Sequence, residues 1–332
     1  MITIRRWLNP GLRYWHQSSF AQQVLFVAGS ALFVSMMVHG LLLVATGGTI
    51  EGPVSLRKAM TFAETGWLLT WSVGWLLPLV PLRRWERRLL IGGTLQFAVG
   101  ETFLMSLQVW RGVPSHYNMS TPFDAVVFAS TGVGALIVTV TMAVLLRAAL
   151  RPSNLAPSLR LAIQGGALIM LIGFAAGLLM ILNSGGIWQG AGHFLEMATR
   201  RRYGGYNGPA AGAVGGDLVL LHALGVHGLQ IVPLPAWLLT YTALDERRRY
   251  RLTALVTASY LALIAILAVQ VFRELPLSAL DLPTLTALLL AILLCLGSHV
   301  AVGLALLGPK EQGNKRTREQ RRAQNLEPRT GR

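Results

Sequence analysis

The chain has 332 residues, of which 53% are hydrophobic and 13% are charged, and its formal net charge is +15. Because an ordinary soluble domain carries about 25% charged residues, this composition argues against a soluble globular protein and predicts an integral membrane protein. The single cysteine, Cys295, excludes an intrachain disulfide, a cysteine-based zinc site and an iron–sulfur cluster.

Eight apolar stretches follow one another along the chain, each long enough to cross a hydrocarbon layer of about 30 Å. We place these spans at residues 21–46, 61–80, 89–110, 123–146, 161–183, 217–243, 252–272 and 283–307. The predicted fold class is all-α, a polytopic transmembrane helix bundle. In this scheme residues 1–20 are an N-terminal segment, residues 21–307 form the bundle with a long outer loop at 184–216, and residues 308–332 are a basic disordered tail.

The basic residues predict the orientation of the bundle. When the connections are sorted by alternating sides, 22 of the 29 Lys and Arg lie with the two termini and with the loops at 83–88, 147–160 and 247–251. Positive residues accumulate on the cytoplasmic side, so both termini are predicted to be cytoplasmic. The positive net charge therefore reflects the orientation of the protein in the membrane. We expect the basic tail to contact anionic lipid, and we do not expect nucleic acid as a partner. The excess of Arg (26) over Lys (3) favours a GC-rich bacterium and its inner membrane.

Ionisable residues inside spans are costly, so their positions are the best pointer to function. His39 in the first span lies about 10 Å below the predicted outer face. Glu101 and Gln108 in the third span are seven residues apart and share one helix face. His222 and His227 lie near the outer end of the sixth span. The sequence therefore predicts a functional site in the outer half of the bilayer, bounded by the first, third and sixth spans.

The sixth span combines these two histidines with two prolines. His222 and His227 are five residues apart, about 140° around a regular helix, so both cannot face the same small ligand. Proline in the segment 233–235 removes two backbone donors, which predicts a kink and leaves the carbonyls of Leu229 and Ile231 without their usual partners. The kink fits the wall of a site, and it equally fits a simple packing feature.

Two features of the fifth and eighth spans lie apart from this region. Gly173 and Gly177 form a GxxxG motif, which lets two helix backbones approach closely and favours a packing contact within the bundle over a dimer interface. His299 lies in the predicted inner half, where a hydrogen bond to a neighbouring carbonyl is its simplest role.

Arginines on the predicted outer side run against the topology rule. Arg111 follows the third span, and Arg200, Arg201 and Arg202 lie in the long outer loop. Guanidinium groups pair bidentately with carboxylates and phosphates, so these arginines are candidates for binding cofactor propionates, lipid phosphates or a solute carboxylate. A surface helix lying on lipid headgroups is the alternative.

Three functional hypotheses are open at this point. The first is haem b binding or quinone-linked electron transfer, with His39 and either His222 or His227 as axial ligands and Glu101 carrying protons. The same three histidines are the candidate ligands of a non-haem metal. The second is a proton-coupled transporter of an anionic solute, in which Glu101 and the histidines relay protons. The third is an assembly or sensory subunit without chemistry of its own.

Two resemblances accompany these hypotheses. The segments Gly100–His116 and Gly216–Pro233 resemble parts of uncharacterised bacterial polytopic inner-membrane proteins, a resemblance that carries no activity and no residue roles. Eight spans with a histidine in the sixth and eighth are also similar to the haem A synthases. The second and fourth spans lack the histidines of that family, so we do not transfer its activity.

Overall fold

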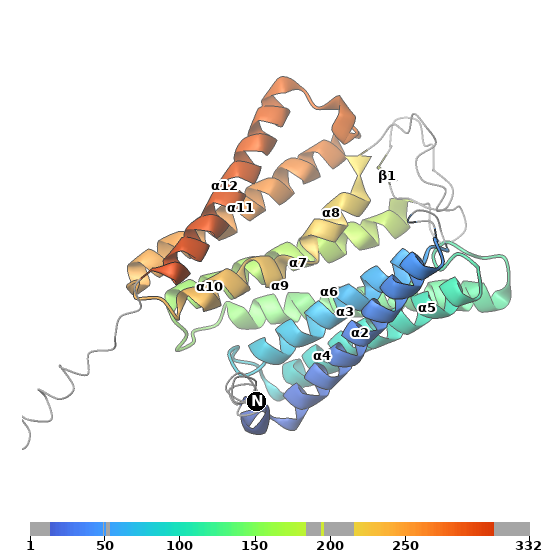
Figure 1. Cartoon of the computed structure of the whole chain (residues 1–332), viewed down its shortest axis with the longest axis horizontal. Helices are drawn as coiled ribbons and strands as arrows, with labels where there is room; N and C mark the ends of the chain where they lie inside the picture. The colour runs from blue at the N-terminus through green and yellow to red at the C-terminus, as the bar shows by residue number, and fades with distance from the viewer. Residues whose placement is uncertain (1–13, 49, 51–53, 184–193, 196–215, 309–332) are drawn as a thin grey trace, which may run out of the picture.

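The computed structural model describes residues 14–48, 50, 54–183, 194–195 and 216–308, and long helices dominate it (Figure 1). The elements in chain order are α2 (Phe20–Ala45), α3 (Leu56–Leu76), α4 (Arg84–Leu95), η1 (Gln96–Glu101), α5 (Thr102–Trp110), α6 (Pro122–Ala149), α7 (Pro157–Asn183), β1 (Phe194–Leu195), β2 (Gly216–Asp217), α8 (Leu218–Gly225), α9 (Gly228–Ile231), α10 (Pro233–Leu239), α11 (Glu246–Phe272), η2 (Leu277–Ala279) and α12 (Leu282–Leu307). The two-residue strands β1 and β2 pair in antiparallel fashion just before α8. The all-α fold class is confirmed.

Polar residues fix where several of these helices begin. Ser19 forms a capping box with Gln22 at the start of α2, and Thr121 accepts a hydrogen bond from the Asp124 N–H at the start of α6. Asp245 and Asp281 cap α11 and α12 in the same way. Each cap satisfies an N–H group that the first helical turn leaves without a partner. These residues therefore set the helix boundaries that hydrophobicity alone leaves open.

Six helical segments in the described part of the chain are long and apolar enough to cross a membrane. They are α2, the continuous α4–η1–α5 segment, α6, α7, α11 and α12. The pair α8 and α9–α10 is a seventh if this bent segment counts as one span. The remaining predicted span, the second at 61–80, falls on α3, which is helical over 21 residues but less apolar. Glu64 and several Thr, Gly and Trp residues lower its mean hydropathy.

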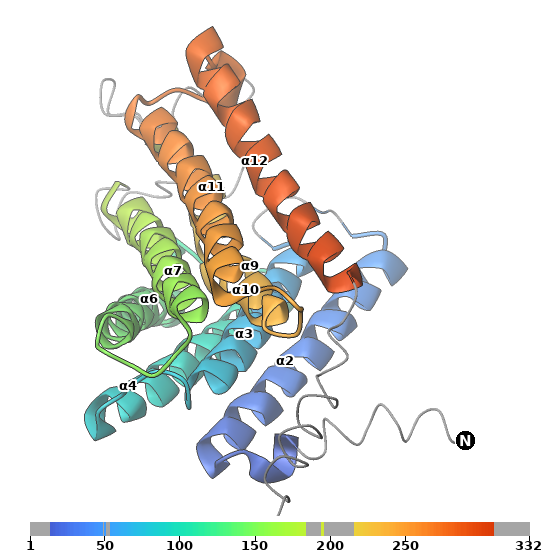
Figure 2. The same cartoon turned by 90° about the vertical axis from the view of Figure 1, so that its left-hand side faces the viewer.

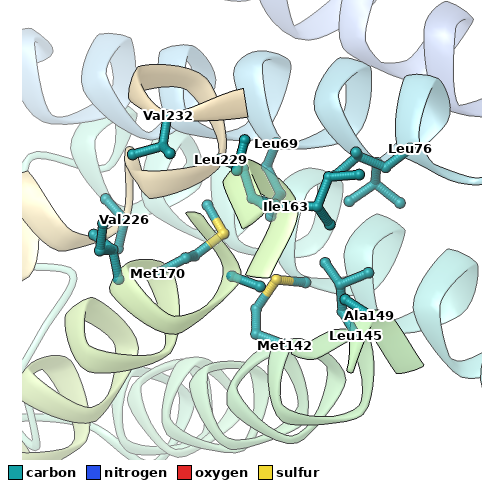
Figure 3. Close-up of a cluster of buried hydrophobic side chains, with 14 of the residues drawn as sticks. Leu69, Leu76, Met142, Leu145, Ala149, Ile163, Met170, Val226, Leu229 and Val232 are labelled. Atoms are coloured by element: carbon teal, nitrogen blue, oxygen red, sulfur yellow. The ribbon is translucent and has the colours of Figure 1, made fainter. Parts of the chain in front are cut away.

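The hydrophobic core lies where α3, α6, α7 and the broken α8–α10 segment meet. Figure 3 shows Leu69 of α3, Met142 of α6, Met170 of α7 and Leu229 of α9 converging on one another. The helix α7 takes the central place, since it packs against α6, α8, α9, α10 and α11. Side chains from four segments that are distant in sequence therefore bury one another.

The first and last long helices lie at opposite edges of the bundle (Figure 2). Helix α2 packs mainly on α3, and α12 packs on α11 and α10. Most of the large apolar side chains of α12 are exposed, and only Ala291, Ser298 and Val302 of this helix are buried. A helix that is apolar on all sides and exposed in the fold suits contact with lipid.

The connections fall at two opposite ends of the bundle (Figure 1). The beginning of α2, the α3–α4, α6–α7 and α10–α11 connections and the end of α12 lie at the same end. The α5–α6 and α11–α12 connections lie at the other end. The three predicted basic loops thus share one end of the molecule.

Glycines bring α7 into backbone contact with α8 and α9. A Cβ atom on Gly173 would lie 2.5 Å from the backbone of Gly225 and of Val226, and one on Gly166 would lie 2.8 Å from the carbonyl oxygen of Gly228. The GxxxG motif at Gly173 therefore serves packing within the bundle, as predicted. The α8–α10 segment is bent by 42°. This bend starts at residues 226–227, where α8 ends, and not at the prolines, because the glycines on both sides draw the backbones together there.

Candidate functional site

The outer arginine of the third span is part of a closed polar cluster between α5 and α6. The Arg111 guanidinium donates to Asp124 Oδ1 over 2.6 Å and also contacts the Gln108 side-chain oxygen. Gln108 Nε2 donates to the same Asp124 oxygen over 2.9 Å, and the Thr121 hydroxyl donates to the other over 2.7 Å. Asp124 and Gln108 are buried. The predicted role of Arg111 in binding an anion would therefore compete with Asp124.

Both ring nitrogens of His39 have partners, and the partner of Nε2 joins α2 to α5. Its Nδ1 lies 2.8 Å from the Ser35 carbonyl oxygen, and its Nε2 lies 3.1 Å from the Trp110 indole nitrogen. A carbonyl only accepts and an indole N–H only donates. His39 is therefore placed as the neutral form with the proton on Nδ1, and it is buried. An axial bond to iron would have to replace the contact with Trp110.

The two histidines of the sixth span face different helices, as their spacing predicts. His222 of α8 lies over α7, with its Nδ1 2.8 Å from the Gly173 carbonyl oxygen. Gly177 leaves room for the ring, because a Cβ atom there would lie 2.9 Å from His222 Nδ1. His227, at the start of α9, interacts electrostatically with Glu64 of α3. The two histidines of the kinked segment thus interact with different helices, His222 with α7 and His227 electrostatically with α3.

The predicted ligands are not gathered into one centre in the described part of the chain. There, no three His, Cys, Asp or Glu side chains lie close enough together to hold a metal ion. Arg200, Arg201 and Arg202 lie outside the described residues. The contacts described for His39, His222 and Arg111 are with other residues of the chain.

Glu101 is different, because it is buried and its carboxyl group is incompletely paired. Only 3% of the residue is exposed, and its Oε1 atom has no hydrogen-bond partner among the residues that the structure describes. Most buried polar atoms have partners, so a buried carboxyl oxygen without one calls for an explanation. Glu101 is thus the predicted site residue whose environment points most directly to chemistry.

A local change of helix type positions this carboxyl group. Residues Gln96–Glu101 form a π-helical turn inside the otherwise α-helical segment from α4 to α5. Such single turns contain an extra residue, widen the helix and are frequent at functional sites. Neighbouring glycines accommodate this turn: a Cβ atom on Gly66 of α3 would lie 3.0 Å from the Ala98 carbonyl oxygen. On the other side, a Cβ atom on Gly134 of α6 would overlap the Glu101 carboxyl group.

Further polar atoms without partners surround the π-helical turn along the same segment. In the described residues, three buried hydroxyl groups on α4 and α5 lack a hydrogen-bond partner, those of Thr94, Thr102 and Ser106. A hydroxyl group both donates and accepts. The segment therefore carries a buried acid together with three buried hydroxyl groups that lack partners in the described part of the chain.

Glu86, at the end of the bundle with the basic loops, is a buried acid that was not among the predicted site residues. Glu86 of α4 is fully buried, and Arg151 contacts both of its oxygens, at 2.7 and 2.5 Å. Arg147 and the Arg83 N–H bind it as well. These residues were predicted only as loop charges that set the topology. Their spacing in sequence, with Glu86 more than 60 residues before Arg147, gave no signal of this pairing.

Comparison with models of known protein families, with curated proteins and with solved structures finds no match for this chain.

Proposed function

We propose that this polytopic membrane protein is a proton-coupled transporter in which Glu101 binds the coupled proton. The observation that carries the proposal is the buried Glu101 carboxyl group, with an oxygen that lacks a partner in the described part of the chain. It lies on a π-helical turn in the interior of a membrane-crossing segment. Intramembrane carboxyl groups that face a bundle interior commonly serve proton relays.

The energetics favour a carboxyl group that changes its charge during function. An ionised carboxylate without a partner in an apolar interior is costly by several kcal/mol, so the resting site suits the neutral acid. Release of the proton then requires a rearrangement that supplies water or a donor. Single π-helical turns are frequent at functional sites, so we place this rearrangement at the widened turn between Gly66 and Gly134.

The solute class is a separate question from the proton site. An anionic solute was predicted from the outer arginines, and Arg111 is engaged by Asp124. Transport is therefore measured with a panel of solutes that includes carboxylates, phosphates and amines. Haem b binding and quinone-linked electron transfer stay predictions with less support, because His39 would have to exchange its contact with Trp110 for iron.

We also propose eight membrane crossings with both termini in the cytoplasm of a bacterium, α3 being a crossing helix that is shielded from lipid. Its support is the arrangement of α3, which packs against α2, α4, η1 and α5, together with the location of the basic loops at one end of the bundle. We expect reporter fusions at residue 308 and in the 152–156 connection to report the cytoplasm, and a fusion at 113–115 to report the opposite side. A fusion at 308 on the side opposite to one at 152–156 would contradict eight crossings.

The substitution Glu101→Gln tests the proton site directly. Gln keeps the shape of the neutral acid, so we expect the variant to fold. Infrared difference spectra of the purified protein across a pH titration should contain a protonated carboxyl band that Glu101→Gln lacks. The matched control is Glu64→Gln on α3, which should keep that band. Identical spectra for wild type and Glu101→Gln would contradict the proposal.

Transport is measured with the same variants in proteoliposomes that contain a pH-sensitive dye. At least one solute of the panel should drive proton movement in the wild type. Glu101→Gln should reduce this movement by about a hundredfold, the scale of losing a positioned proton-transfer group, while Glu64→Gln should leave it within a few fold. Solute-driven proton movement that persists in Glu101→Gln would show that another group carries the proton.

A further inference from the structure

His299 of α12 lies between two backbone carbonyl groups. Its Nδ1 is 2.8 Å from the Cys295 carbonyl oxygen, one turn earlier in the same helix. Its Nε2 is 3.2 Å from the carbonyl oxygen of Ile231, at the end of α9. A carbonyl oxygen accepts hydrogen bonds and never donates them. Both ring nitrogens can donate at the same time only if the ring is the protonated imidazolium.

His299 and His39 differ in the partner of their second ring nitrogen. Both histidines direct Nδ1 to the carbonyl four residues earlier in their own helix. The second nitrogen of His39 meets the Trp110 N–H, a donor, so that ring is complete as a neutral imidazole. The second nitrogen of His299 meets an acceptor instead. The chemical type of the second partner therefore distinguishes a neutral histidine from a charged one.

The carbonyl of Ile231 needs a donor from outside its own helix. In a regular helix it would accept from the backbone of residue 235, but Pro235 has no N–H group. Gln230, the residue expected to satisfy one of the freed carbonyls, donates to Leu68 and Ser72 of α3 instead. His299 takes that place. The proline in α10 thus creates the acceptor that holds α12.

We propose that His299 is a second proton-binding site, held as an imidazolium that bridges α12 to the break in the α8–α10 segment. When the proton leaves, one of the two carbonyl groups loses its donor. The Nδ1 contact is the shorter of the two, so the remaining proton stays on Nδ1 and the hydrogen bond from α12 to the Ile231 carbonyl oxygen is lost. The effect is confined to the contact between α12 and the end of α9, because α12 still packs on α11 and α10. This site is distinct from Glu101, so it stands or falls separately from the proposed transport function.

Titratable groups are present on α12 itself, on the neighbouring helix α11 and on the broken α8–α10 segment. On α12, the Cys295 thiol lies 3.9 Å from His299 Nδ1. On α11, the Tyr260 hydroxyl donates to the Leu224 carbonyl at the end of α8 over 2.7 Å, and it interacts electrostatically with Cys295. On the broken segment, the nearest titratable groups in sequence are His222 and His227. His222 Nδ1 contacts the Gly173 carbonyl oxygen, and His227 interacts electrostatically with Glu64. Of these groups, only His299 contacts the Ile231 carbonyl oxygen. We therefore attribute a pH-dependent change in this contact to loss of the His299 proton.

Nitrogen NMR of histidine-labelled protein tests the protonation state. An imidazolium has a proton on both ring nitrogens, whereas a neutral ring has one bare nitrogen. We expect one histidine to show two protonated nitrogens at pH 8, where a free histidine is neutral, and we expect this signal to vanish in His299→Ala. If the signal lost in His299→Ala has a bare nitrogen at pH 8, the proposal is wrong.

Two variants separate the bridge from a merely structural role. His299→Lys keeps a positive donor, and His299→Ala removes it. Amide hydrogen exchange of α9 and α12 is measured across a pH range and corrected for the intrinsic pH dependence of exchange. In the wild type the exchange rate should rise about tenfold as His299 loses its proton, the increase expected when a charge-assisted hydrogen bond is lost. His299→Ala should exchange fast at every pH, and His299→Lys should remain slow across the same range. Exchange that changes with pH in His299→Ala as it does in the wild type would overturn the bridge, and the NMR result decides the protonation state even if a variant does not fold.

Discussion

Replacing Glu86 with alanine is expected to lower the free energy of unfolding by about 2–3 kcal/mol, because it leaves two arginines without their shared partner at a covered site. Glu86 is fully buried, and its oxygens accept from Arg151, Arg147 and the Arg83 N–H. The value is set below that of a wholly buried pair, because the Arg147 side chain is 53% exposed and that of Arg151 is 24% exposed. Loss of helical circular dichroism in a detergent titration measures the change.

The matched control for this prediction is Asp281→Asn at the opposite end of the bundle. Asp281 pairs with Arg273 over 2.8 Å, and both side chains are exposed. Hydrogen bonds from the Thr284 side chain, from its backbone N–H and from Arg273 lower the pKa of Asp281 to about 2. The carboxylate is thus ionised at neutral pH, but solvent screens the pair. We expect no measurable change in stability, and equal losses for the two variants would refute the assignment of Glu86 as a stability centre.

The helices themselves were largely predictable, because their length and apolar character follow from the membrane. The predicted span 21–46 corresponds to α2 at Phe20–Ala45, and 283–307 corresponds to α12 at Leu282–Leu307. The predicted starts at 89 and 252 were late, since α4 begins at Arg84 and α11 at Glu246. Charged residues at these starts continue the helix, and hydropathy has no means of marking a helical turn that leaves the apolar layer.

The partners of the polar residues were not predictable, since they depend on how each helix is rotated. The sequence singled out Glu101, and the structure places it in a distinct environment. The π-helical turn at Gln96–Glu101 was not predictable from the sequence, because one extra residue in a turn barely changes the apolar pattern. The partner of His299 depends on the carbonyl that Pro235 frees on a different helix. Such contacts are a property of the packed bundle.

The rotation of the helices also decides the partners of the histidines. His39 and His222 were grouped as haem ligands by their similar depth, and depth is what a sequence can give. The structure assigns them to Trp110 and to Gly173. These contacts join α2 to α5 and α8 to α7.

Replacing Gly173 with alanine is expected to destabilise the bundle by about 2–3 kcal/mol, the cost of forcing extra atoms into a packed contact. The added Cβ atom would lie 2.5 Å from the backbone of Gly225 and of Val226. Backbone cannot turn aside as a side chain can, so α8 would have to move away from α7 and take His222 with it. The control is Gly297→Ala on α12, where the new Cβ atom meets no described atom within 4 Å apart from those of its own chain neighbours and helix backbone. That variant should be unchanged or more stable by about 0.5–1 kcal/mol, since alanine loses less backbone freedom than glycine. Detergent titrations of both variants measure the difference, and equal stabilities would mean that the α7–α8 contact is looser than the glycine pair indicates.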